Sequence, residues 1–74
     1  MIKTILNKLI TLTYDDGSKK TIKSVNKKND EIISYYNEYN FFTNNKQIVN
    51  IVISSKDNEK VYNPKVKAGV YSFI

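Results

Sequence analysis

The sequence predicts an α+β protein in which a small, mostly antiparallel sheet has one helix packed on a face. Three observations predict this class: two strand-like runs joined by a tight-turn signal, one segment with apolar residues at helical spacing, and one long apolar run typical of a buried strand. They occur in the order strand, strand, helix, strand, strand, and the last residues leave room for one more strand. Because hairpins dominate this order, we expect antiparallel pairing.

The segment Lys8–Val25 is expected to form a β-hairpin. Its first strand alternates in period two up to Tyr14, and the returning strand is expected over Lys19–Val25. Between them, Asp16-Gly17 is a strong turn signal, because glycine accepts the positive φ of a tight hairpin. The preceding residues also fit helical spacing, but we favour an extended strand with a bulge at Asn7.

A helix is expected to begin near Asn29, which is a good N-cap residue. Asp30 and Glu31 place negative charge on the first turn, where the helix dipole favours it, and the cluster Thr43-Asn44-Asn45 ends the element. Helical spacing predicts one apolar face, made of Ile32, Tyr35, Tyr36, Tyr39 and Phe42.

Residues Gln47–Ser55 form the strongest predicted strand. Both of its faces are apolar, with Val49, Ile51 and Ile53 on one and Ile48 and Val52 on the other. Such a strand lies centrally or has its second face covered. If that side of the sheet is open, Ile48 and Val52 form an apolar strip that a partner could cover.

A shorter strand is expected over Lys60–Asn63, after a turn at Lys56–Glu59. Pro64 cannot donate to a ladder and therefore marks an edge or a break. The last segment, Lys65–Ile74, ends on aromatic and aliphatic residues, so we expect a docked strand rather than a frayed tail.

The length of 74 residues accommodates a single domain, residues 1–74, with a thin stability margin. Cysteine and histidine are absent, so the sequence excludes disulfides and predicts neither a metal site nor a cofactor. Packing or oligomerisation must then supply stability, which makes a homodimer one expectation. The lack of cysteine fits a reducing compartment and no apolar stretch is long enough to cross a membrane, so we expect a cytoplasmic protein.

Catalysis lacks its usual groups, because the common general base and the thiol nucleophile are both missing. Each of the remaining carboxylate pairs lies at a predicted turn or helix start, where carboxylates have structural roles. The pairs are Asp15 with Asp16, Asp30 with Glu31, and Asp57 with Glu59. We therefore expect a protein that is not an enzyme and that acts by binding.

An aromatic row on the predicted helix is the first candidate binding surface. It contains Tyr35, Tyr36, Tyr39, Phe41 and Phe42. Four members share the predicted apolar face, so we favour a role in the core, although a row of tyrosines also suits a half-buried surface that binds a protein or stacks on bases. Phe41 lies off that face. Either the helix stops near Asn40 and Phe41 turns inward, or Phe41 is an exposed apolar anchor.

A lysine cluster is the second candidate surface, and the net charge of +5 attracts anionic partners. The cluster consists of Lys19, Lys20, Lys23, Lys27 and Lys28. Lys19, Thr21 and Lys23 share one face of a strand, which is the solvent face if Ile22 points inward. We favour an edge strand that lysine protects from aggregation over a phosphate-binding stripe. The absence of arginine counts against base-specific recognition.

Two functional hypotheses follow. The first is a non-enzymatic protein-binding module, and within that class an inhibitor or accessory protein of a phage or other mobile element. Lys, Asn, Ile, Tyr and Phe, whose codons are rich in A and T, make up more than half of the chain and indicate an AT-rich bacterial genome. The second is sequence-tolerant nucleic-acid binding by the lysine-rich strand. We favour a protein partner, with the lysine cluster and Tyr35, Tyr36, Tyr39 and Phe41 as candidate contact residues.

Overall fold

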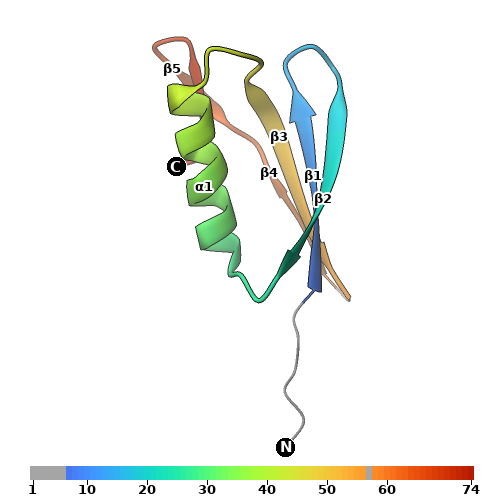
Figure 1. Ribbon diagram of the computed structural model, residues 1–74. Helices are drawn as coiled ribbons and strands as arrows, with labels where there is room; N and C mark the ends of the chain where they lie inside the picture. Colours follow the sequence, from blue (N-terminus) through green and yellow to red (C-terminus); the bar gives the residue numbers. More distant parts are fainter. Residues whose placement is uncertain (1–6, 57) are drawn as a thin grey trace, which may run out of the picture.

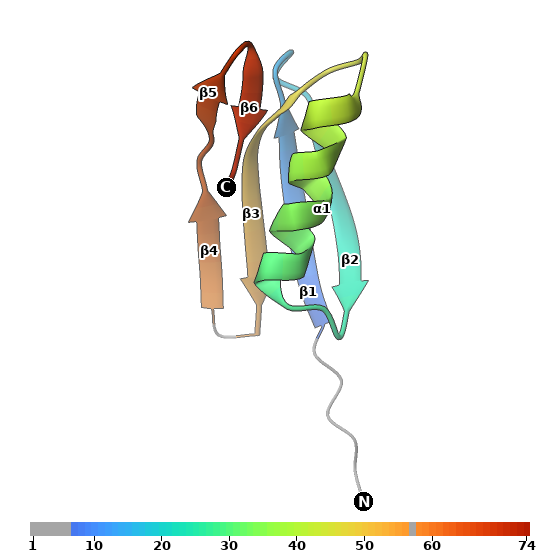
Figure 2. The same ribbon diagram turned by 90° about the vertical axis from the view of Figure 1, so that its left-hand side faces the viewer.

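The computed structural model describes residues 7–56 and 58–74, which form one helix and six strands. In chain order these are β1 (Asn7–Tyr14), β2 (Lys19–Val25), α1 (Asn29–Phe42), β3 (Ile48–Ser55), β4 (Asn58–Tyr62), β5 (Lys65–Lys67) and β6 (Val70–Ser72). Figures 1 and 2 show α1 on one side of the main sheet. The predicted α+β class is confirmed. Within the described residues α1 is the only helix, and it is neither long nor apolar enough to cross a membrane.

The main sheet has four strands in the order β2-β1-β3-β4, and every neighbouring pair is antiparallel. β1 and β2 form the predicted hairpin. Gly17 has a φ of 87°, the left-handed conformation that this turn requires. Asn7 pairs regularly with Val25, so the bulge expected at Asn7 is wrong. The proposed extension of the strand before Asn7 lies outside the described residues.

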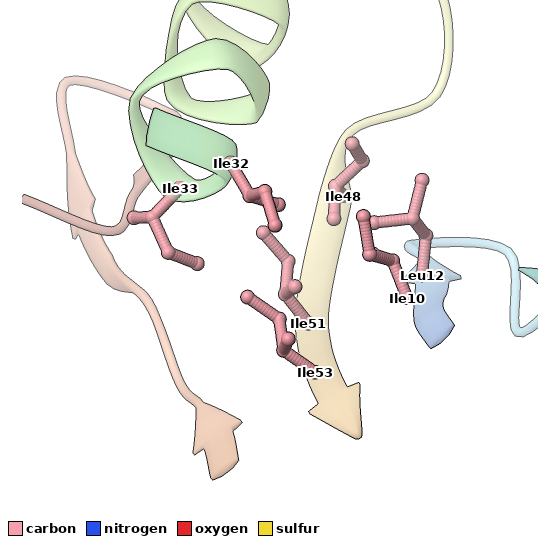
Figure 3. Close-up of a cluster of buried hydrophobic side chains, with 7 residues drawn as sticks. All are labelled: Ile10, Leu12, Ile32, Ile33, Ile48, Ile51 and Ile53. Carbon is pink, nitrogen blue, oxygen red and sulfur yellow. The ribbon is translucent and has the colours of Figure 1, made fainter. Parts of the chain in front are cut away.

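Seven aliphatic side chains between the helix and the sheet form the core (Figure 3). They are Ile10, Leu12, Ile32, Ile33, Ile48, Ile51 and Ile53. The register aligns them, because Ile10 lies opposite Ile53 and Leu12 lies opposite Ile51, and directly opposite residues point to the same face. Each such buried side chain contributes roughly 1.5–3 kcal/mol relative to an exposed one.

A bulge moves Ile48 to the core face. The pairing of β1 with β3 shifts between Thr13 and Tyr14, and Val49 is the extra residue on β3. An extra residue interrupts the alternation of a strand, so Ile48 is buried in the core. The predicted faces are therefore wrong at this end of the strand. Of the predicted apolar strip, only Val52 lies on the face away from the helix.

The helix turns a different face to the sheet from the predicted one. Its buried residues are Ile32, Ile33 and Asn40, and Tyr36 packs against the core. The predicted apolar face is wrong for Tyr35, Tyr39 and Phe42, which are exposed. Burial favours an isoleucine over a tyrosine, because a buried tyrosine hydroxyl needs a hydrogen-bond partner.

Asn29 does not cap the helix as predicted. The N-cap is Lys28, which makes no side-chain capping bond. Asn29 Oδ1 instead accepts a hydrogen bond from Lys8 Nζ at 2.7 Å, and Asn29 Nδ2 donates to the Tyr62 hydroxyl at 3.1 Å. These bonds connect the start of α1 to β1 and β4. The acidic residues predicted in the first turn are confirmed.

The last segment forms a hairpin rather than the single strand that we expected. β5 and β6 pair as a separate two-stranded sheet. Ala68 and Gly69 between them have φ of 51° and 78°, as a tight turn with two positive φ angles requires. The predicted docking is confirmed for Phe73, which packs against the core, whereas Ile74 is exposed. Pro64 lies at the break between β4 and β5, as expected.

A buried asparagine connects the helix, β3 and β6. Asn40 Nδ2 donates to the carbonyl oxygens of Ile48 and Tyr71, both at 2.8 Å, and Asn40 Oδ1 accepts from Ile48 N at 2.7 Å. Gln47 adds a second bridge, because its Nε2 donates to Asn40 O at 2.8 Å and its Oε1 accepts from Tyr71 N at 3.1 Å. Both polar atoms of the Asn40 side chain thus have partners, which explains how this amide is accommodated in the core.

Candidate protein-binding groove

A groove of about 350 Å³ lies between the edge strand β2 and helix α1. Its apolar lining comes from Ile10, Ile22 and Ile32. Its walls are Lys23, Ser24, Val25 and Lys27 on the strand side, and Glu31, Tyr35 and Tyr36 on the helix. We call this feature the β2–α1 groove. It brings members of both sequence-predicted surfaces to one place.

The opposite flank of the helix is covered by the C-terminal segment of the same chain. Phe73 N donates to Asn37 Oδ1 at 2.8 Å, and Phe73 packs against the core. β6 is held near the C-terminal end of α1 by the bonds that Asn40 and Gln47 make to Tyr71 (Figure 2). This flank of α1 is therefore covered beside its C-terminal half, although a hollow of about 330 Å³ remains beside Ile33, Tyr62 and Phe73. No described segment of the chain occupies the β2–α1 groove.

The five lysines of the cluster are exposed and lie on or directly after β2. Lys19, Lys20 and Lys23 belong to β2, and Lys27 and Lys28 precede α1. β2 is an edge strand and Ile22 packs toward the core, so Lys19 and Lys23 lie on the face away from the helix, as expected. None of the five forms an ion pair with another described residue. Their charge is thus left for solvent or for a partner.

Tyr35 and Tyr36 form the helical wall of the groove. Their rings meet edge to face, with centroids 5.0 Å apart and an interplanar angle of 89°. Tyr35 is 65% exposed, whereas Tyr36 is half-buried against the core. Burial, with smaller contributions from Tyr35 and Tyr14, raises the pKa of the Tyr36 hydroxyl. This hydroxyl stays neutral at physiological pH and is able to donate a hydrogen bond.

The other members of the aromatic row lie outside the groove. Tyr39 is partly exposed, and its hydroxyl donates a long hydrogen bond of 3.4 Å to Lys46 O. The helix continues through Phe41, which is 68% exposed, so Phe41 does not turn inward. Phe41 and Phe42 pack edge to face with centroids 5.0 Å apart. They form a small apolar tip at the end of the helix.

The carboxylates of the hairpin turn have structural partners. Asp16 Oδ1 accepts hydrogen bonds from Ser18 N at 2.9 Å and Ser18 Oγ at 2.6 Å, and Lys46 Nζ lies 3.3 Å from Asp16 Oδ2. Asp15 Oδ2 accepts from Gln47 N at 3.3 Å. The turn interpretation of this pair is confirmed. Within residues 7–56 and 58–74 no acidic cluster is suited to hold a metal ion, and Asp57 lies outside the described residues.

We expect the Asp16 carboxyl to titrate below an ordinary aspartate. The hydrogen bonds from Ser18, followed by the charge of Lys46, lower its pKa from 3.8 to about 2. Because the pKa in the folded protein lies below the unfolded value, Asp16 stabilises the hairpin above the unfolded pKa. That contribution is lost as the pH falls from 3.8 through about 2. NMR titration of the side-chain carboxyl carbon measures the pKa, and Ser18→Ala should move it back toward 3.8. An unchanged pKa in that variant would contradict the assignment.

The sheet face away from α1 mixes apolar and polar residues. Leu9 and Val61 are exposed there, and Val52 is half-buried. Leu9 lies between Lys23 on β2 and Ser54 on β3, so polar neighbours interrupt the apolar surface. A wider hollow of about 450 Å³ opens at one end of this face, but its lining is mainly lysine, serine and asparagine. The β2–α1 groove has the larger number of aliphatic and aromatic residues in its lining.

No protein-family model, curated protein or solved structure matches the chain. The candidate site is therefore defined by geometry alone. Of the predicted contact residues, Lys23, Lys27, Tyr35 and Tyr36 line the groove. Sequence reasoning missed Glu31 as a wall of the groove, because a first-turn glutamate is already explained by the helix dipole.

Proposed function

We propose that this protein is a non-enzymatic protein-binding module and that the β2–α1 groove receives its partner. The observation that carries the proposal is the uncovered flank of α1, where an apolar floor, an aromatic wall and an edge strand meet. Protein interfaces combine aromatic and aliphatic anchors at their centre with polar residues at the rim. Here Ile22 and Tyr35 supply the anchors and Lys27 supplies the rim. Lys23 lines the groove from β2, with its side chain on the open-face side of the sheet.

Within this class, the finer proposal is an inhibitor or accessory protein encoded by a phage or another mobile element. It is supported by the short chain, the lack of histidine and cysteine, and the preference for residues with AT-rich codons. The lack of cysteine also supports a cytoplasmic location. A basic rim suits an acidic surface on the partner.

Sequence-tolerant nucleic-acid binding is the second candidate function. The observation in its favour is that five exposed lysines without an ion-pair partner among the described residues lie along one edge. Such a row suits backbone phosphates. The nearby helix surface opposes this function, because Asp30, Glu31 and Glu38 are exposed and Glu31 lines the groove. We therefore place a protein partner first.

A binding assay with generic fluorescent DNA and RNA at two salt concentrations separates the two functions. We expect dissociation constants above about 100 µM at physiological salt, weaker than typical non-specific binding by nucleic-acid-binding proteins. The contrary result is micromolar affinity that falls steeply as salt rises. Single lysine-to-alanine variants would then be compared: Lys20→Ala, Lys23→Ala, Lys27→Ala and Lys28→Ala. If each of them weakened binding to every nucleic-acid sequence and reduced the dependence of affinity on salt, the second function would replace the first.

The mass in solution, measured on the same samples, shows whether the partner is a second copy of the chain. A homodimer would use the open sheet face, where Leu9 and Val61 are exposed. Pairing through two β2 edges is disfavoured, because it sets lysines against lysines. A monomeric mass would direct the search to a different protein.

A further inference from the structure

We propose that the β2–α1 groove binds by strand addition, in which an extended acidic segment of the partner protein pairs with the free edge of β2. This inference rests on the proposed protein-binding function and specifies the chemistry of the partner. The segment carries acidic residues at alternate positions, on the side of the open sheet face. Its intervening residues are apolar and lie over the groove.

The backbone of β2 offers an outward row of donors and acceptors. At the closed end of the hairpin, Tyr14 N donates to Ser18 O at 2.8 Å, and bonded pairs alternate along an antiparallel ladder. Two sets result: Lys20, Ile22 and Ser24 turn their backbone groups toward β1, and Lys19, Thr21, Lys23 and Val25 turn theirs away. No described strand lies on that outer side of β2. The outward set is therefore able to pair with another chain.

An added strand would place every second side chain over the groove. Ile22 pairs with Ile10 in the ladder and packs at the edge of the core, beside the half-buried Tyr36. A side chain of the partner opposite Ile22 would continue this apolar layer outward. It would also cover the ring of Tyr35, which is largely exposed. Removal of this apolar surface from water favours an aliphatic residue at these positions.

The lysines favour acidic residues at the intervening positions. Lys19 and Lys23 project on the open-face side of β2, and neither has an ion-pair partner among the described residues. Side chains of a neighbouring strand lie directly beside them, and opposite charges across two strands attract. Lys27, at the end of the groove, extends the basic rim beyond β2.

The same charges disfavour two other occupants. A second copy of the chain, paired through β2, would bring like charges together. A nucleic acid carries negative charge along its whole length and would meet Glu31 on the groove wall, with Glu38 exposed further along the helix. A protein strand avoids both conflicts, because its successive side chains point to opposite faces. Its acidic residues can lie beside the lysines on the open-face side, while its apolar residues lie over the groove.

NMR spectroscopy with a model peptide tests the inference. The probe is a peptide of alternating glutamate and valine with 7 residues, the length of β2, titrated into the isotope-labelled full chain. We expect the outward amides of Thr21 and Lys23 to shift downfield and to gain protection from hydrogen exchange, because they acquire hydrogen bonds. The amides of Ile22 and Ser24 already face β1 and should change less.

Matched controls separate backbone pairing from charge. The same peptide, N-methylated on the edge that pairs, keeps its side chains but loses its donors, so its affinity should fall by about tenfold or more. Lys23→Glu should weaken binding of the unmodified peptide on the order of tenfold, whereas Lys67→Glu, the same charge change on β5, should alter it by less than about twofold.

Several results would overturn strand addition. They are no binding of the alternating peptide at about millimolar concentration, equal binding of the N-methylated peptide, or amide changes confined to β4 or to the open sheet face. Displacement of the peptide from β2 by single-stranded DNA of higher affinity would also overturn it, in favour of nucleic acid. A protein that is captured at the groove without any change in the Thr21 and Lys23 amides would refute strand addition and leave the protein-binding function standing.

Discussion

Asn40→Leu is expected to lower the free energy of unfolding by about 3–5 kcal/mol. The Asn40 side chain is fully buried, and its loss removes the partners of Ile48 N, Ile48 O and Tyr71 O. Each buried polar group left unsatisfied costs about 1–3 kcal/mol. A domain of this length has a total stability of roughly 4–11 kcal/mol, so the variant should lose a large part of it. Denaturant unfolding followed by circular dichroism measures the change.

Asn44→Leu is the matched control for this experiment. Asn44 lies exposed in the loop after α1, so the same substitution there should change stability by no more than about 0.5 kcal/mol. If Asn40→Leu cost no more than its control, the bonds from Asn40 would not be what holds β6 and β3 to the end of the helix.

Ile51→Ala is expected to cost about 2–5 kcal/mol. Ile51 is 0% exposed and lies at the centre of the core, directly opposite Leu12 on β1. The substitution removes buried methyl and methylene groups and leaves a cavity between sheet and helix, and both effects destabilise the fold. Thermal and denaturant unfolding of the variant beside the unmodified protein give the loss.

The neighbouring residue supplies an internal comparison. Val52 is half-buried on the opposite face of β3, which α1 does not cover. Val52→Ala should therefore cost only about 1 kcal/mol or less. Similar losses at both positions would mean that the second face of the sheet is covered in solution, contrary to the structure.

Local features of the fold were predictable from the sequence. The alternation of β1, the Asp16-Gly17 turn and the bounds of β2 at Lys19–Val25 all depend on residues close together in the chain. Turn chemistry and period-two patterning carry such information directly. The end of the helix at Phe42 was predictable for the same reason, because the cluster Thr43-Asn44-Asn45 follows it directly.

The orientation of the helix was not predictable in the same way. Two overlapping stripes of its surface are apolar, and the sheet selects the one with Ile33 over the one with Tyr39. Asn40 looks like a surface residue in the sequence, yet it is buried because partners 8 and 31 residues away satisfy it. The bulge at Val49 likewise depends on pairing with β1. These are tertiary effects that override local pattern.

The candidate site was predictable only as separate parts. Lysine spacing indicated an edge strand, and the aromatic row indicated a surface on the helix. Their meeting at Lys23 and Tyr35 depends on where α1 crosses the sheet. The free flank further depends on Phe73 and β6 occupying the other side. Neither placement follows from spacing along the chain.

Site-specific photo-crosslinking tests the central claim most directly, with Tyr35→p-benzoylphenylalanine in the groove and Val61→p-benzoylphenylalanine on the open sheet face as its control. Both positions are exposed, and the variants would be expressed in the organism that encodes the protein and irradiated there. We expect a discrete covalent adduct with one protein from position 35 and none from position 61. A crosslink at position 61 alone, adducts with nucleic acid, or no adduct at position 35 would contradict the assignment of the β2–α1 groove as a protein-binding site.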